Sequence, residues 1–253
     1  MSSELLPELE VLLPIHNESE SIAATIREIY EVLGPLVRVR FILCEDGSAD
    51  NTQEVLNAIA TEVPAKLFLS DTRKGYSRAV RDGMMQQEAP YLLCLDSDGQ
   101  CDPRDFKKFW DIRDSADILI GWRVDRADTW MRKLMSRSFY HVWRVLYRCP
   151  IHDPSCPFVL ARRAVIQELW PQMGAMQQGF WWEFTARAKR LGLSIGELPV
   201  HHRARAAGVT QVYSLKKLPG IGYRHGIALF KILSETRHTS RAATDSLLGR
   251  GVE

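Results

Sequence analysis

Short apolar runs alternate with segments of helical period through the first hundred residues. Residues 11–14 form a strand-like run, and apolar residues then recur at the spacing of one helix face, at Ile22, Ile26, Ile29 and Leu33. Further strands are predicted at 37–44, 67–69 and 91–95, and helices at 51–60 and 76–87. This alternation predicts an α/β fold, Rossmann-like, in which helices cover both faces of a mainly parallel sheet.

Beyond residue 100 the alternation is looser but continues. We expect helices around Phe106, at 130–147 and at 181–191, and strands at 117–121, near Phe158 and at 194–200. We find no linker or internal repeat, so one domain is predicted over 1–236. Residues 237–253 are predicted to form a flexible tail, because the chain is polar there.

Several classes of protein do not fit this sequence. We expect a cytoplasmic chain, because no stretch approaches the roughly 20 apolar residues of a membrane-spanning helix and the N-terminus does not resemble a secretion signal. The five cysteines form no C-x-x-C pair, which favours buried reduced thiols over disulfides or a zinc site. Neither a P-loop motif nor an early G-x-G-x-x-G occurs, which argues against a P-loop NTPase or a dinucleotide oxidoreductase.

Charge is distributed unevenly along the chain. Residues 1–100 carry 8 Lys and Arg against 17 Asp and Glu, whereas residues 101–253 carry 25 against 14. An acidic half suits cation chemistry, and a basic half suits phosphates or an anionic surface. An uneven solvated surface would produce the same split, so charge alone leaves the function open. No nucleic-acid partner is expected.

Acidic residues follow three of the predicted strands directly. Glu18 follows the first strand, Asp46 the second, and Asp96 and Asp98 the strand at 91–95. Ligands of such sheets bind beyond the carboxyl ends of the strands, so these carboxylates are expected to converge. Their mutual repulsion would be relieved by a hard divalent cation that bridges to a diphosphate.

Each acidic group also has an ordinary structural interpretation. Glu18 favours the start of a helix, and Asp46-Gly47-Ser48 fits a turn followed by a helix cap. An Asp-x-Asp pair is common by chance. The occurrence of all three groups at strand ends favours a site.

The sequence resembles the family 2 inverting glycosyltransferases of GT-A fold, particularly the dolichol- or polyprenyl-phosphate mannosyltransferase branch. The resemblance covers most of residues 8–215. Its motifs in this chain are Pro14-x-x-Asn17-Glu18, Glu45-Asp46-Gly47-Ser48-x-Asp50-x-Thr52, Arg73-Lys74-Gly75, Asp96-x-Asp98-x-Gln100, Gly121-x-Arg123, Arg132-x-x-x-Ser136, Asp153, Phe158, Arg162-Arg163, Glu183 and the segment Arg203 to Thr210. It implies a nucleotide-binding half at 8–100 and an acceptor-binding half at 101–236.

The resemblance also implies roles for individual residues around a nucleotide-sugar donor. The expected donor-site residues are Pro14, Asn17, Glu18, Asp46, Gly47, Lys74 and Asp96. Asp46 would accept a hydrogen bond from the base or ribose, and Lys74 could add positive charge near the phosphates. Asp96, Asp98 and Gln100 would bind Mg²⁺ or Mn²⁺, which offsets the charge that grows on the leaving diphosphate.

The implied acceptor is a polyprenyl phosphate, whose oxygen is already anionic and needs cations more than a base. The expected acceptor-site residues are Arg123, Arg132, Ser136, Arg203 and Arg205. An exposed basic face would explain these arginines equally well. A hydroxyl acceptor would instead require a carboxylate base, for which Asp153 and Glu183 are the candidates. A non-catalytic sugar-nucleotide-binding protein is the other alternative.

The chain departs from that branch in two places. Pro157 stands where a glycine is usual before Phe158, and the usual Gly-x-Ser-Lys is Gly208-Val209-Thr210-Gln211 here. Gln211 stands where that motif has a lysine, so this chain lacks one positive charge that the branch has for recognition of a lipid phosphate. His201 and His202 follow a strand and are expected to point to opposite faces, so one of them could face the site.

The segment 121–150 suggests a peripheral membrane contact. It carries seven Arg and Lys against two Asp, with apolar residues at helical spacing that include Trp130 and Trp143. Interfacial tryptophans would be partly exposed, whereas tryptophans of an ordinary core-facing helix would be covered. A membrane-anchored partner chain is the alternative route to a lipid acceptor.

Overall fold

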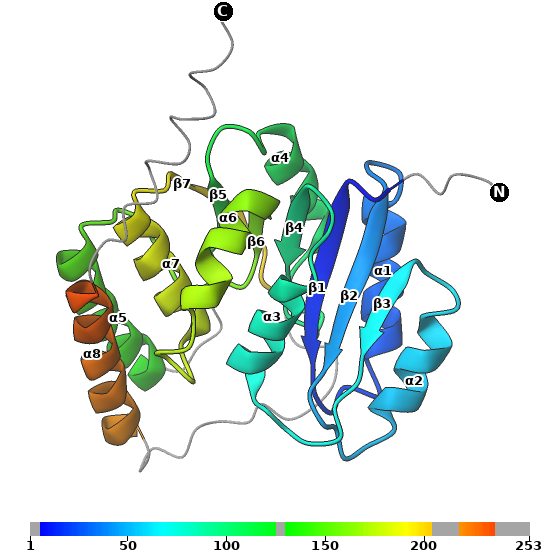
Figure 1. Ribbon diagram of the computed structural model, residues 1–253, viewed down its shortest axis with the longest axis horizontal. Helices are drawn as coiled ribbons and strands as arrows, with labels where there is room; N and C mark the ends of the chain where they lie inside the picture. Colours follow the sequence, from blue (N-terminus) through cyan, green and yellow to red (C-terminus); the bar gives the residue numbers. More distant parts are fainter. Residues whose placement is uncertain (1–5, 125–129, 204–217, 236–253) are drawn as a thin grey trace, which may run out of the picture.

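The computed structural model describes residues 6–124, 130–203 and 218–235, without the side chains of 130–138, 218, 219 and 221. Within these residues the chain forms a seven-stranded sheet flanked by helices (Figure 1). The strands are β1 (Leu9–Ile15), β2 (Val39–Glu45), β3 (Ala65–Phe68), β4 (Tyr91–Cys94), β5 (Ile118–Arg123), β6 (Val159–Arg162) and β7 (Ile195–Val200). The helices are α1 (Ile22–Leu33), α2 (Thr52–Ile59), α3 (Tyr76–Met85), α4 (Phe106–Asp111), α5 (Trp130–Tyr147), α6 (Arg163–Leu169), α7 (Phe180–Leu191) and α8 (Leu218–Ser234), with 3₁₀ turns η1 (Pro103–Asp105) and η2 (Trp170–Gln172).

The strand order is β3-β2-β1-β4-β6-β5-β7. β6 runs antiparallel to both of its neighbours, and the other pairs are parallel. All strands except β6 therefore end at the same edge of the sheet. The expected α/β fold with a mainly parallel sheet is confirmed.

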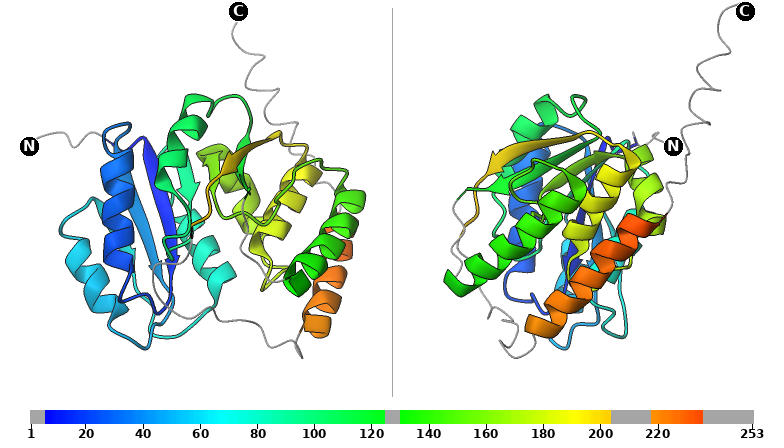
Figure 2. Two further views of the ribbon diagram at one scale, coloured as in Figure 1. Left: turned by 180° about the vertical axis from the view of Figure 1, so that it is seen from behind. Right: turned by 90° about the vertical axis from the view of Figure 1, so that its left-hand side faces the viewer.

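Helices cover both faces of the sheet, which explains why its central strands are mostly apolar. α1 and α2 lie over one face, and α3 and α6 lie over the other (Figures 1 and 2). Every residue of β1 is buried, and so are six of the seven residues of β2. A continuous apolar run is typical of a strand buried on both faces.

The apolar side chains form two clusters. The larger one extends from Leu9 to Val200 and lies on both faces of the sheet. The smaller one joins α5, α7 and α8 through residues that include Trp143, Leu229 and Ile232. Trp143 is fully covered, so the core-facing interpretation is correct for this tryptophan, and Trp130 lies outside the described side chains. The predicted tail at 237–253 also lies outside the described residues.

All five cysteines are buried and none forms a disulfide, as expected. They are Cys44, Cys94, Cys101, Cys149 and Cys156. Burial raises the pKa of the Cys44 and Cys156 thiols to about 12 each. These thiols are therefore protonated packing groups at neutral pH.

Glu183 is a fully buried carboxylate at the start of α7. Its oxygens accept hydrogen bonds from the backbone N–H groups of Gly174, Ala175 and Met176 at 2.7–3.0 Å. The Arg187 guanidinium, one helical turn further on, lies 2.8 Å away. These contacts give Glu183 a structural task, which is to join the start of α7 to the segment 174–176, and the catalytic role expected for it stays a prediction.

The contact of α3 with the sheet gives a first prediction. A Cβ added at Gly83 would overlap Leu12 Cδ1 and lie 2.8 Å from Cys44 Sγ. We expect Gly83→Ala to lower the free energy of unfolding by about 1–3 kcal/mol in urea titrations, because the helix must move off the strands. Gly226→Ala in α8 is the matched control, since nothing lies within 4 Å of its added Cβ, and we expect about 0.5–1 kcal/mol of stabilisation. Equal stability of the two variants would contradict this packing.

Arg187 allows a buried and an exposed carboxylate to be compared on one guanidinium. It pairs with the buried Glu183 and also with Glu235, whose side chain is 40% exposed. We expect Glu183→Gln to cost about 3–5 kcal/mol in urea titrations, because the buried Arg187 charge loses its buried partner. Glu235→Gln should cost about 1 kcal/mol or less. Similar losses for both variants would contradict the structural role of Glu183.

Candidate functional site

The acidic strand ends lie together at one edge of the sheet. β1 lies between β2 and β4, with Ile15 opposite Glu45 and Leu12 opposite Cys94. The segments that follow these three strands therefore leave the sheet side by side. The backbone segments that carry Glu18, Asp46 and Asp96 therefore lie next to one another, as the sequence predicted.

The loops after β1 and β2 are joined by hydrogen bonds. The Asn17 N–H donates to Ser48 Oγ at 2.9 Å, and Asn17 Oδ1 accepts from the Ala49 N–H at 2.8 Å. The Glu18 N–H donates to Thr52 Oγ1 at 3.0 Å. Asn17 has a φ of +54°, a left-handed conformation that asparagine tolerates better than most residues. The Asn-Glu motif thus shapes a loop beside Pro14, which lies buried in β1.

Asp46 fixes the loop that leads into α3. Its carboxylate accepts from the Lys74 N–H at 2.6 Å and from the Gly75 N–H at 2.9 and 3.1 Å, and Asp46 is only 3% exposed. Gly47 has a φ of +62°, and a Cβ there would overlap the backbone of the same loop. The Lys74 ammonium pairs with Asp82 at 3.1 Å. Asp46 therefore shapes the expected nucleoside region by holding the backbone of Lys74 and Gly75.

A cavity of about 470 Å³ lies between the carboxyl ends of β2 and β3 and helix α3. Its polar lining comes from Glu45, Asp46, Ser70, Lys74 and Asp82. Burial opposes ionisation of Glu45, but hydrogen bonds from Ser48, Ser70 and Gln53 outweigh it and lower the pKa of Glu45. Asp96 and Asp98 are not among the lining residues, so the cavity does not include the expected metal site.

Asp96 and Asp98 follow β4 in a tight turn. Asp98 is 8% exposed, and its Oδ1 accepts from the Gln100 N–H at 3.1 Å. The Tyr76 hydroxyl donates to Asp96 Oδ1 at 2.8 Å and accepts from Trp181 Nε1 at 2.8 Å. Burial of that hydroxyl and the nearby Asp96 charge raise the pKa of Tyr76.

Tyr76 and Trp181 were missed by the sequence analysis. Tyr76 belongs to α3 and Trp181 to α7, and the two residues are 105 positions apart in the chain. Neither residue belongs to the motifs that carried the family resemblance. Only their position against the acidic turn shows that they orient Asp96.

The residues present fit a divalent cation that shares its ligands with a substrate. Within the described residues no group of three or more His, Cys, Asp or Glu side chains is placed to hold a metal ion. Mg²⁺ is commonly bound in proteins through one or two carboxylates together with substrate phosphates. Asp96, Asp98 and the amide oxygen of Gln100 would provide such a partial set of oxygen ligands.

Arg123 and Asp153 form a nearly buried ion pair. Arg123 Nε and Nη2 lie 2.7 and 3.0 Å from the two oxygens of Asp153, and Nη2 also donates to Ser155 Oγ at 2.9 Å. Burial opposes the charge on Arg123, but Asp153 outweighs it and raises the Arg123 pKa. Both Asp153 oxygens thus lie against Arg123 and position its guanidinium, and the base role expected for Asp153 stays a prediction.

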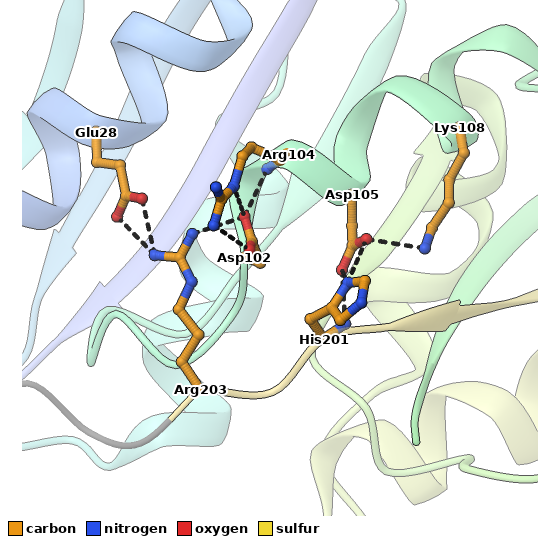
Figure 3. Close-up of polar contacts among 7 residues, drawn as sticks. All are labelled: Glu28, Asp102, Arg104, Asp105, Lys108, His201 and Arg203. Carbon is orange, nitrogen blue, oxygen red and sulfur yellow. Dashed lines mark hydrogen bonds and ion pairs between the residues drawn. The ribbon is translucent and has the colours of Figure 1, made fainter. Parts of the chain in front are cut away.

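Of the other residues expected to bind the acceptor, the structure describes the side chain of Arg203 alone. Arg203 lies in ion pairs with Glu28 and Asp102 (Figure 3). Its charge is therefore already balanced, which argues against the expected role as a phosphate ligand. Arg205 and the side chains of Arg132 and Ser136 lie outside the description, so their roles stay predictions.

Comparisons with known proteins agree with this architecture. Residues 10–170 match the family model described as glycosyl transferase family 2. An undecaprenyl-phosphate 4-deoxy-4-formamido-L-arabinose transferase from Yersinia enterocolitica is 25% identical over 87% of this chain and 67% of its own. A dodecaprenyl-phosphate galacturonate synthase from Rhizobium johnstonii is 28% identical, with 81% of this chain and 61% of its own covered. The chain spans 36% of the glycosyltransferase AglD from Haloferax volcanii, at 27% identity over 85% of this chain.

Solved structures show the same fold. Glucosyl-3-phosphoglycerate synthase from Mycobacterium tuberculosis, in complex with Mn²⁺, UDP and glucosyl-3-phosphoglycerate, superimposes with a TM-score of 0.65 at 18% identity. The match covers 92% of this chain and 82% of that protein. At this identity the likeness shows the fold alone, which is that of the GT-A glycosyltransferases. With the family match over most of its length, the chain belongs to glycosyl transferase family 2.

Proposed function

We propose that this protein transfers a sugar from a nucleotide diphosphate sugar, of the GDP-mannose or UDP-glucose type, to polyprenyl phosphate with inversion. The observation that carries the proposal is the Asp96–Asp98 turn at the end of β4, beside the loops that follow β1 and β2. Two of the relatives are named as enzymes of undecaprenyl phosphate and dodecaprenyl phosphate.

The acidic turn would hold Mg²⁺ or Mn²⁺ against the donor diphosphate. When bound, the cation would stabilise the negative charge that grows on the leaving nucleoside diphosphate. Asp96 would be oriented for this task by the Tyr76 hydroxyl, which Trp181 in turn holds in place. The neighbouring loops, fixed by Asn17 and Asp46, would receive the nucleoside.

The contacts of Asp153 and Glu183, the two candidate general bases, support an acceptor whose attack requires no general base. Asp153 is held by Arg123, and Glu183 is held by Arg187 and three backbone N–H groups. A phosphate oxygen is already a nucleophile, so transfer to it requires orientation and charge balance more than proton removal. Arg132, Ser136 and Arg205 are the residues that we propose to bind the acceptor phosphate.

A basic and apolar surface supports contact with a membrane. Among the described residues no helix is long and apolar enough to span a bilayer. Two neighbouring helices, however, expose large apolar side chains, which are Val142 and Val145 on α5 and Tyr223, Ile227 and Phe230 on α8. Exposed Arg144, Arg224 and Lys231 accompany them, and neither helix contains an Asp or Glu. We propose that this α5–α8 face rests on anionic lipid, where the acceptor resides.

The metal proposal predicts the effect of one substitution. Asp98→Asn should lower Mn²⁺- or Mg²⁺-dependent sugar transfer by roughly a hundredfold or more, because about 3 kcal/mol of transition-state stabilisation is lost with the counter-charge. Turnover is measured with GDP-mannose and UDP-glucose against undecaprenyl phosphate and a panel of hydroxyl acceptors. Asp111→Asn on α4, an exposed carboxylate paired with Lys107, is the control and should be unaffected. Near-normal turnover of Asp98→Asn in the presence of a chelator would exclude this role.

Vesicle co-sedimentation at low salt tests the membrane contact. Replacing both Arg224 and Lys231 by Gln should weaken binding to vesicles rich in phosphatidylglycerol roughly 30-fold, at about 1 kcal/mol for each charge. The control replaces Arg38 and Lys107, which are exposed elsewhere, and should bind like the unchanged protein. Equal failure of the unchanged protein to bind anionic and neutral vesicles would exclude lipid contact by this face. A membrane-anchored partner chain would then be needed to present the acceptor.

A further inference from the structure

The backbone after β7 is joined to the backbone of the acidic turn. The Arg203 N–H donates to the Gln100 carbonyl at 2.8 Å, and Gln100 Nε2 donates to the Arg203 carbonyl at 3.1 Å. Between these bonds, Cys101 and His202 form an isolated antiparallel bridge. Gln100 is itself hydrogen-bonded through its N–H to Asp98. Gln100 thus links the segment that follows β7 to Asp98, an expected metal ligand, through hydrogen bonds.

The Arg203 side chain adds two ion pairs to this junction (Figure 3). Its Nη1 lies 2.7 and 3.0 Å from the two oxygens of Glu28 on α1, and its Nη2 lies 2.6 Å from Asp102 Oδ1. Asp102 also accepts from the guanidinium of Arg104 at 2.8 and 3.0 Å. Burial opposes ionisation of Asp102, but the two arginines outweigh it and hold its pKa well below the usual range.

A second junction holds the chain two residues earlier. The His201 N–H donates to Asp105 Oδ2 at 2.6 Å, and the His201 ring nitrogen Nδ1 lies 3.0 Å from Asp105 Oδ1. Lys108 contacts both Asp105 and the Pro199 carbonyl. Lys108 on α4 and Asp105 in η1 therefore hold the chain at Pro199 and His201, whereas Gln100, Asp102 and Glu28 hold it at Arg203. Figure 3 shows the side chains of both junctions.

We propose that Arg203 is a positioning residue that sets the start of the acceptor-binding segment relative to Asp96 and Asp98. We call Arg203, Glu28 and Asp102 the Arg203 clamp. The inference rests on the proposed function, because Arg205, two residues after Arg203, is assigned to the acceptor there. The Arg203 guanidinium already lies against the carboxylates of Glu28 and Asp102, an arrangement suited to holding the chain in place.

The clamp matters because transfer requires the acceptor oxygen and the donor carbon to meet in one geometry. A misplacement of about 1 Å can cost two orders of magnitude in rate. The donor is expected beside the acidic turn and the acceptor beside the segment after β7. Arg203 connects the two through side chain and backbone, whereas neither substrate need contact it.

Two substitutions weaken the clamp with little risk to the fold. Glu28→Gln removes one partner, whose side chain is 43% exposed, and Arg203→Lys keeps the charge but cannot hold both carboxylates as the guanidinium does. The matched control is Arg27→Gln, also on α1, which breaks an exposed bidentate pair with Glu62 at 2.7 Å. Hydrogen exchange of the Arg203 amide, calorimetry of UDP and GDP binding with Mn²⁺, and the KM for undecaprenyl phosphate are measured on each protein.

We expect both clamp variants to speed exchange of the backbone amide at position 203 about tenfold, leave nucleotide affinity within about twofold and raise the acceptor KM at least fivefold. Arg27→Gln should change none of the three. Unchanged exchange at Arg203 would overturn the clamp, and a loss of nucleotide affinity would assign Arg203 to the donor site. Faster exchange with an unchanged acceptor KM would overturn the positioning role. If the unchanged protein transfers no sugar to undecaprenyl phosphate, the proposed function fails, and the exchange measurement still decides whether the clamp exists.

Discussion

The backbone hydrogen bonds that pair β1 in parallel with β2 on one side and β4 on the other bring three distant chain segments to one edge of the sheet. Each of these segments carries carboxylates, and their side-by-side position is what makes cation and diphosphate chemistry possible there. The pairing is stable because helices bury both faces of the strands, so the position of the site depends on the apolar core. The loops add only local shape, through Asn17, Gly47 and the contacts of Asp46.

The charged groups around this edge differ in what holds them. Asp46, Asp153 and Glu183 are satisfied by backbone N–H groups or by a guanidinium, and they serve to fix loops and arginines. At the acidic turn, Asp96 accepts from the Tyr76 hydroxyl and Asp98 accepts from the Gln100 N–H.

Most of the fold could be predicted from hydrophobic period, and part of the site could not. Residues 130–147 were predicted as one helix and form α5, whereas α6 and α8 were missed because a short helix after β6 and a glycine-rich segment give weak periodic signals. The acidic turn was found because motif and strand end coincide. The partners of Asp153, Glu183 and Arg203 depend on contacts between segments far apart in sequence, which spacing along the chain does not encode.

The five buried thiols can serve as probes of local unfolding. Cys44, Cys94, Cys101 and Cys156 belong to the main apolar cluster, whereas Cys149 belongs to the cluster formed with α5, α7 and α8. A protonated thiol shielded from solvent is inert toward alkylating reagents, so each cysteine becomes modifiable only when its own cluster opens. The rate at which Cys149 is alkylated, relative to the other four, therefore reports whether the helices that carry the exposed apolar face open independently of the sheet.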